Sequence, residues 1–139
     1  MINRTDRLFS YFEYKHPEVN INICRSSIDP EVGRILNHFN AEGSCSLNLD
    51  TGKVDIQLND DIFRKSAIYE ELAHVLQFHR DSYVEVNSLD YYQREVEVAE
   101  CMLKRVAEGR LRLSDEEIAQ TNSNLLVYQE AVVNLGGSV

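Results

Sequence analysis

Three ionisable side chains within five residues carry the chemistry that this chain could perform. Glu70, Glu71 and His74 lie in the segment Tyr69–Gln77, with Glu70 and His74 four residues apart. Residues at this spacing project from the same face of an α-helix, so a carboxylate and an imidazole placed there could bind one divalent metal ion. Glu71 lies beside them, where a carboxylate could act as a general base toward water. The segment therefore predicts a metal site with a neighbouring proton acceptor.

A helical wheel over residues 63–79 separates an apolar face from the face that carries these groups. Glu70 and His74 are about 40° apart on the second face, and Glu71 is about 60° from His74. Aromatic residues rather than basic ones flank these groups, which indicates a partly buried polar site. The apolar face comprises Ile68, Leu72, Val75, Leu76 and His79, and the second face comprises Phe63, Ala67, Glu70, Glu71, His74 and Phe78.

A third carboxylate, Glu95, falls within the apolar face of the next predicted helix. An uncompensated buried carboxylate costs on the order of several kcal/mol, and a cation shared with His74 would offset that cost. Twenty residues lie between His74 and Glu95, enough for a loop and an antiparallel return. We therefore predict Glu70, His74 and Glu95 as ligands of a divalent metal. The other residues of this apolar face are Tyr91, Tyr92, Val98, Ala99, Met102, Leu103 and Val106, whereas Glu97 and Glu100 point toward solvent.

Each of these residues also has an interpretation without a metal. Glu70 could be a solvated acid near the N-terminal half of its helix, where the macrodipole favours negative charge. His74 could be a core histidine that is hydrogen-bonded to a neighbour. For Glu71 and Glu95 the alternative is an ion pair, with Lys65 or Arg94 in the first case and with Arg80, Arg94 or Arg105 in the second.

The pattern along the chain predicts the strands that would support this site. Residues 19–24 alternate apolar and polar side chains, as a half-buried strand does. Residues 44–49 and 53–58 alternate in the same way and flank Asp50-Thr51-Gly52, which is a strong hairpin signal at about 44–58. The expected fold is α+β, with a small antiparallel sheet of about three strands.

Helix signals surround the strands. Short helices are expected over about 5–14 and from Pro30 through Leu36, and three longer ones over about 61–80, 89–108 and 114–135. Asp60 or Asp61 is available as the N-cap of the first long helix, and Ser88 or Asp90 as that of the second. Ser114 and Glu117 form a capping box at the start of the third, and Gly109 ends the second. No linker interrupts the pattern, so one domain over 1–139 is expected.

Composition narrows the classes of partner and compartment. The chain has 139 residues and a formal charge of −9, which argues against binding along a nucleic-acid backbone. The sequence predicts neither a membrane helix nor a signal peptide, so we expect synthesis in the cytoplasm. Three cysteines, Cys24, Cys45 and Cys101, show no disulfide or zinc-knuckle spacing and are expected to be reduced and mostly buried.

The segment around His74 resembles a known motif. Glu70-Glu71-Leu72-Ala73-His74 matches the H-E-x-x-H motif of zinc peptidases except that Glu70 replaces the first His. With the downstream segment 91–100 and Thr121, Leu125 and Tyr128, it resembles the zincin-like metallopeptidase domains of bacterial polymorphic toxin systems, over about residues 54–130. The order hairpin, active helix, glutamate helix is also similar to a minimal gluzincin core.

The resemblance implies a zincin-like core and a function. It implies that His74 and Glu95 are metal ligands, that Glu71 is the general base, and that Glu70 occupies the position of the first ligand. It further implies a zinc-dependent peptidase that acts on a peptide or protein, with an effector role, delivery out of the cell and a cognate inhibitor protein. One imidazole and two carboxylates make a harder, more anionic site than zinc peptidases use, so manganese or iron stays open. The alternative is an inactive zincin-like scaffold that acts as a protein-binding or immunity-type protein.

Overall fold

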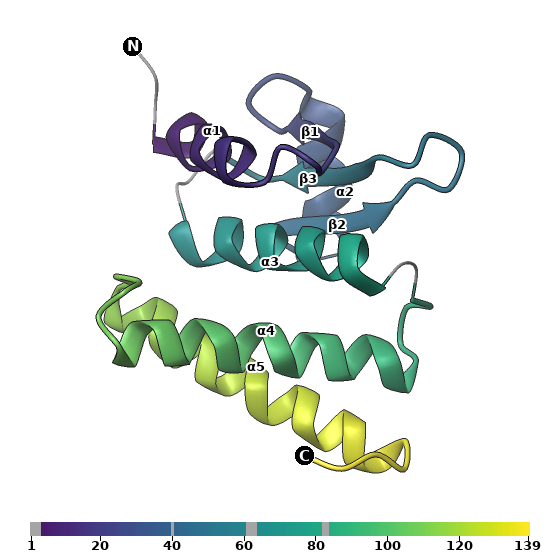
Figure 1. Cartoon of the computed structure of the whole chain (residues 1–139), viewed down its shortest axis with the longest axis vertical. Helices are drawn as coiled ribbons and strands as arrows, with labels where there is room; N and C mark the ends of the chain where they lie inside the picture. Colours follow the sequence, from purple (N-terminus) through teal and green to yellow (C-terminus); the bar gives the residue numbers. More distant parts are fainter. Residues whose placement is uncertain (1–3, 40, 61–63, 82–83) are drawn as a thin grey trace. The chain divides into compact units, whose positions relative to one another are not determined.

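The computed structural model describes residues 4–39, 41–60, 64–81 and 84–139 (Figure 1). The chain divides into two compact units, Met1–Ser82 and Tyr83–Val139. The predicted single domain over 1–139 stays a prediction. The described elements are α1 (Arg4–Lys15), β1 (Ile21–Arg25), α2 (Pro30–His38), β2 (Gly43–Leu47), β3 (Val54–Leu58) and α3 (Lys65–Asp81) in the first unit, and α4 (Leu89–Ala107) and α5 (Asp115–Asn134) in the second.

The first unit contains a three-stranded sheet with β3 at its centre, in the order β1-β3-β2. Strand β2 pairs antiparallel with β3, which confirms the predicted hairpin. Strand β1 pairs parallel with β3, with Ile23 opposite Ile56. The α+β class is therefore confirmed, but the prediction of a wholly antiparallel sheet was wrong for β1. Helix α2 carries the chain from β1 to the far edge, and the hairpin then returns β3 in the direction of β1.

Every second side chain of β3 is apolar and lies in the core of this unit. Val54, Ile56 and Leu58 are buried, and Ile56 is completely inaccessible to solvent. They belong to one apolar cluster with residues of α1 and α3. The cluster comprises Phe9, Phe12, Val19, Val54, Ile56, Leu58, Ile68, Leu72 and Val75.

Helix α3 begins later than the sequence predicts. It starts at Lys65, Arg64 is not helical, and residues 61–63, which include the predicted cap Asp61, lie outside the described residues. Asp60 does not cap α3. Its carboxylate instead accepts hydrogen bonds from the backbone N–H and the hydroxyl of Ser27, at 2.9 and 2.7 Å. The predicted position of His79 on the apolar face was also wrong, because His79 is exposed.

The second unit is a pair of helices whose ends follow the sequence closely. Ser88 is the N-cap of α4, and Gly109 adopts a positive φ of 73° just after that helix ends. Ser114 and Glu117 form the predicted capping box at the start of α5. Helices α4 and α5 pack against each other along this unit.

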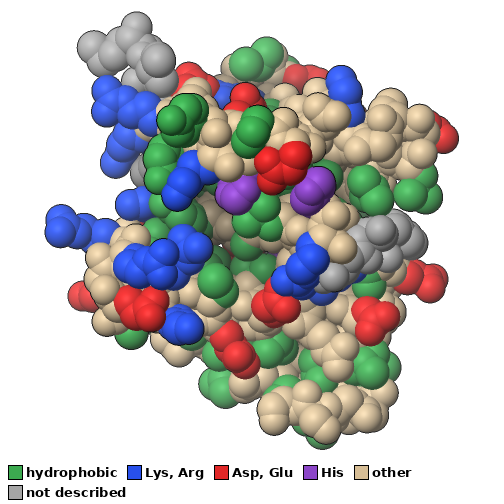
Figure 2. Space-filling view, viewed as in Figure 1, with side chains coloured by type: hydrophobic (Ala, Val, Ile, Leu, Met, Phe, Trp, Pro, Cys, Tyr) green, Lys and Arg blue, Asp and Glu red, His purple; other side chains and the backbone are tan. Residues whose placement is uncertain are grey.

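No helix in the described part of the chain has the length and apolarity needed to cross a membrane. Basic and acidic side chains both occur on the face shown in Figure 2, so the net negative charge does not make that face uniformly acidic.

Cys24 and Cys45 are half-buried free thiols, whereas Cys101 is exposed, contrary to the expectation of burial.

Candidate metal centre

Helix α3 positions three of the four predicted site residues. Ile68, Leu72 and Val75 recur at spacings of four and three residues, and all three are buried in the core of the first unit. This anchored stripe fixes the rotation of the helix about its axis. Glu70, Glu71 and His74 are therefore held at defined positions on the remaining surface of α3.

Glu70 and His74 are close enough to share a cation. Both side chains are half-buried, and a carboxylate oxygen of Glu70 lies within 4.8 Å of a ring nitrogen of His74. Two ligands of one zinc ion are at most about 4.2 Å apart, because each bond is about 2.1 Å long. The bound of 4.8 Å on the Glu70–His74 separation is close to this value. The two residues therefore fit a divalent cation by donor type and by distance.

The imidazole of His74 has a hydrogen-bond partner that the sequence did not reveal. Nδ1 of His74 lies 2.8 Å from Oε1 of Gln77, one helical turn further on. An amide oxygen only accepts, so Nδ1 donates, and a neutral ring then carries its lone pair on Nε2. Neutral imidazole is the form that binds a metal. The bond also fits the alternative of a core histidine, although His74 is half-buried rather than buried.

Glu71 is directed toward the edge strand β2. Its side chain is 8% exposed, and a Cβ built on Gly43 would lie 3.2 Å from Cγ of Glu71 and 3.4 Å from Oε1. The absence of a side chain at Gly43 thus makes room for this carboxylate. Glu71 is more deeply buried than Glu70 or His74, its neighbours on the helix. Gly43 gave no signal in the sequence beyond being a glycine at the start of a strand.

Glu95 lies on α4, in the second unit. Its side chain is 7% exposed, and Val98, Ala99 and Met102 of the same helix are buried with it. Glu97 and Glu100 are exposed. The predicted orientation of these three carboxylates on α4 is therefore confirmed. The convergence of Glu95 with Glu70 and His74 stays a prediction.

Comparison of the chain with protein-family models, with curated proteins and with solved structures finds no match. The resemblance to zincin-like peptidases therefore depends on the motif residues alone. Within α3, Glu70 and His74 lie together as the motif requires, and Glu71 is beside them.

Proposed function

We propose that this protein is a metal-dependent hydrolase whose substrate is a peptide or protein. The observation that carries the proposal is the Glu70–His74 pair on α3, within 4.8 Å, with the His74 ring held through Nδ1. A buried carboxylate, Glu71, is adjacent in the chain and could serve as a base. Metal ligands of this kind next to a buried general base are the parts that metal-assisted hydrolysis uses.

The proposed ligands are Glu70, His74 and Glu95. Glu95 is included because the sequence predicts it as a ligand. Its burial on α4 supports this role, because a desolvated carboxylate favours a cationic neighbour. A divalent cation held by these residues would supply a Lewis acid that makes water more acidic. One imidazole and two carboxylates suit zinc, and they also suit manganese and iron.

Glu71 is the proposed proton carrier. It accepts a proton from the attacking water as the water oxygen adds to the peptide carbonyl. It then delivers that proton to the leaving amine as the C–N bond breaks. Packing against β2 beside Gly43 holds the Glu71 carboxylate in place and limits its access to solvent. A pre-oriented base loses little conformational freedom when it reacts.

The biological setting comes from the resemblance alone. We propose synthesis in the cytoplasm and, if the protein is an effector, delivery out of the cell and control by a cognate inhibitor protein. The alternative, an inactive scaffold that binds a protein partner, uses the same fold without cleavage.

Metal content decides whether the site exists. We would measure it by elemental mass spectrometry on untagged, dialysed protein, for wild type, His74→Ala and the matched control His79→Ala. His79 is exposed on the same helix, so its loss leaves the proposed ligands intact. We expect near-stoichiometric zinc, manganese or iron in wild type and His79→Ala and none in His74→Ala. Wild type without metal, even after these ions are added back, would contradict the proposal.

Cleavage decides between the enzyme and the inactive scaffold. Metal-loaded wild type and Glu71→Gln would be compared on a library of fluorescence-quenched peptides. We expect Glu71→Gln to keep its metal and to lose about 10²–10⁴-fold in rate, as the loss of a general base does. A wild type that binds metal and cleaves no peptide or denatured protein would favour the inactive scaffold.

A further inference from the structure

We infer that Gln77 is a positioning residue for His74, which fixes the imidazole in the tautomer protonated on Nδ1 and so presents Nε2 to the cation. The inference rests on the proposed function, because the ligand role of His74 belongs to it. Gln77 and His74 both lie on α3, in the first unit.

The geometry of the pair supports this role. Oε1 of Gln77 lies 2.8 Å from Nδ1 of His74, the usual length of a good hydrogen bond. The two residues are three positions apart, the spacing at which side chains on a helix meet. Gln77 is only 4% exposed, so little water competes for its carbonyl oxygen. The bond therefore holds the ring more firmly than an exposed pair would.

The consequence for the ring follows from the chemistry of imidazole. In a neutral imidazole, the hydrogen bond made by one ring nitrogen determines which of the two nitrogens carries the proton. With Nδ1–H donated to Gln77, the lone pair is on Nε2 and the ring plane is fixed. Metal-binding histidines commonly donate their second N–H to an acceptor in this way, and losing that acceptor lowers metal affinity about 10–100-fold.

Two substitutions separate this role from simple packing. Gln77→Met keeps the length and burial of the side chain and removes the acceptor. Gln77→Glu keeps the length and restores an acceptor oxygen. If Gln77 only filled space, Gln77→Met would be the milder change, because a buried carboxylate costs more than a thioether. If Gln77 orients the ring, Gln77→Glu is the variant that rescues it.

The tautomer is measured directly and without metal. Protein labelled with ¹⁵N-histidine would be studied by long-range ¹H–¹⁵N correlation in chelator at about pH 8, where an ordinary histidine is neutral, with His74→Ala to assign the signals. We expect His74 of wild type and Gln77→Glu to be protonated on Nδ1, and Gln77→Met to show a mixture of both tautomers. Protonation on Nε2 in wild type, or an unchanged tautomer in Gln77→Met, would overturn the inference.

A zinc titration of the same proteins links the tautomer to the ligand role. We expect Gln77→Met to bind zinc about 10–100-fold more weakly than wild type, and Gln77→Glu to bind within a few-fold of it. Wild type that binds zinc but lacks the Nδ1–H tautomer would overturn the role of Gln77 alone. Wild type that holds this tautomer and takes up no metal would overturn the proposed function, and with it the presentation of Nε2 to a cation.

Discussion

Asp60 follows β3 and is hydrogen-bonded to the segment that follows β1, the strand parallel to β3. Its carboxylate accepts from the backbone and hydroxyl of Ser27 and from the hydroxyl of Ser26, at 2.7–3.1 Å. Burial by itself would raise the pKa of Asp60, but these hydrogen bonds and that from its own backbone together lower the pKa below its ordinary value. A lowered pKa in the folded state stabilises the fold above the unfolded pKa, and this contribution is lost as pH falls through the folded pKa.

Asp60→Asn therefore tests a pH-dependent contribution to stability. At pH 7 we expect the variant to be less stable by about 1 kcal/mol, a modest value because the carboxylate is partly solvated. The difference should shrink as the pH is lowered below about 4, where the unfolded carboxyl takes up its proton. Urea unfolding at several pH values measures it. If the difference in stability between wild type and Asp60→Asn were constant from pH 7 to pH 3, the charge of Asp60 would not be its cause.

Gly43→Ala tests the packing of Glu71. The new Cβ would lie 3.2 Å from Cγ of Glu71 and 3.3 Å from the backbone oxygen of Gln57, so the Glu71 side chain must move. We expect a loss of about 1 kcal/mol in stability and a lower rate of peptide cleavage, with metal content unchanged. Ser46→Ala, at an exposed position of the same strand, is the control. Equal rates in both variants would show that the base does not depend on this contact.

The site residues divide according to the signal that each leaves in the sequence. Glu70 and His74 could be predicted because helical spacing alone places them together, and the burial of Glu95 because apolar residues surround it on its own helix. Gln77 and Gly43 could not. A glutamine at a buried helix position looks like any polar residue, and the contact between Gly43 and Glu71 joins residues far apart in the chain.

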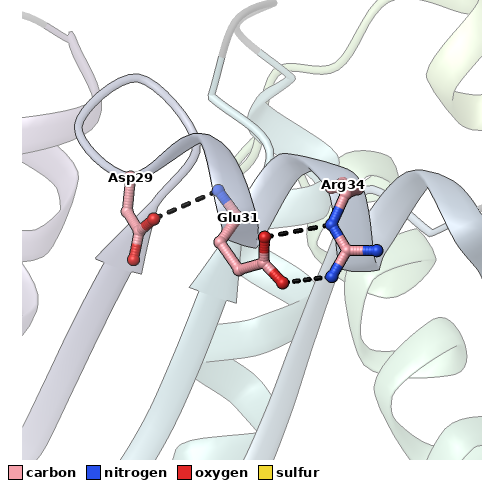
Figure 3. Close-up of polar contacts among 3 residues, drawn as sticks. All are labelled: Asp29, Glu31 and Arg34. Atoms are coloured by element: carbon pink, nitrogen blue, oxygen red, sulfur yellow. Dashed lines mark hydrogen bonds and ion pairs between the residues drawn. The ribbon is translucent and has the colours of Figure 1, made fainter.

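Among the helices and strands, the ends of α4 and α5 were predicted best, because a cap is a local interaction. Helix α2 begins at Pro30, as predicted, and Asp29 is its N-cap, accepting from the backbone N–H of Glu31 at 3.1 Å (Figure 3). Arg34 pairs with Glu31 one turn on, and its hydrogen bond lowers the pKa of the Glu31 carboxyl. This pair is fully exposed, so it contributes little to stability. The pairing of β1 depends on residues about thirty positions away, and local pattern did not reveal it.

Ser114→Ala tests the capping box of α5. The hydroxyl of Ser114 accepts from the N–H of Glu117, and Oε1 of Glu117 accepts from the N–H of Ser114, both at 3.1 Å. We expect a loss of about 1 kcal/mol and faster amide exchange in the first turn of α5. Ser123→Ala, exposed in the middle of the same helix, should be neutral or slightly stabilising, because alanine is the better helix former. Similar losses in both variants would mean that the cap contributes nothing particular.

The ligands that we propose for the metal belong to both units of the chain, Glu70 and His74 to the first and Glu95 to the second. Binding to the folded protein alone would raise stability with ion concentration, by about 2.7 kcal/mol at 100 times the dissociation constant. We therefore expect added zinc to raise the melting temperature of wild type and to leave that of His74→Ala unchanged.

Glu95→Gln tests the ligand from the second unit. We expect the substitution to lower the melting temperature of metal-loaded protein and to have little effect in chelator, because an amide is a much weaker ligand of a divalent cation than a carboxylate. Glu97→Gln, exposed on the same helix, is the control and should change neither temperature. Equal effects of Glu95→Gln with and without metal would remove Glu95 from the site.

The central position of β3 has a consequence for the order of folding. Strands β1 and β2 both pair only with β3 among the described strands, so no strand pair can form until residues 54–58 have been synthesised. The hairpin closes a short loop, whereas β1 must close a much longer one, and long loops close more slowly. We expect pulsed hydrogen exchange to protect the amides of β2 and β3 before those of β1. An unpaired β1 would then be the segment most exposed to aggregation while the chain folds.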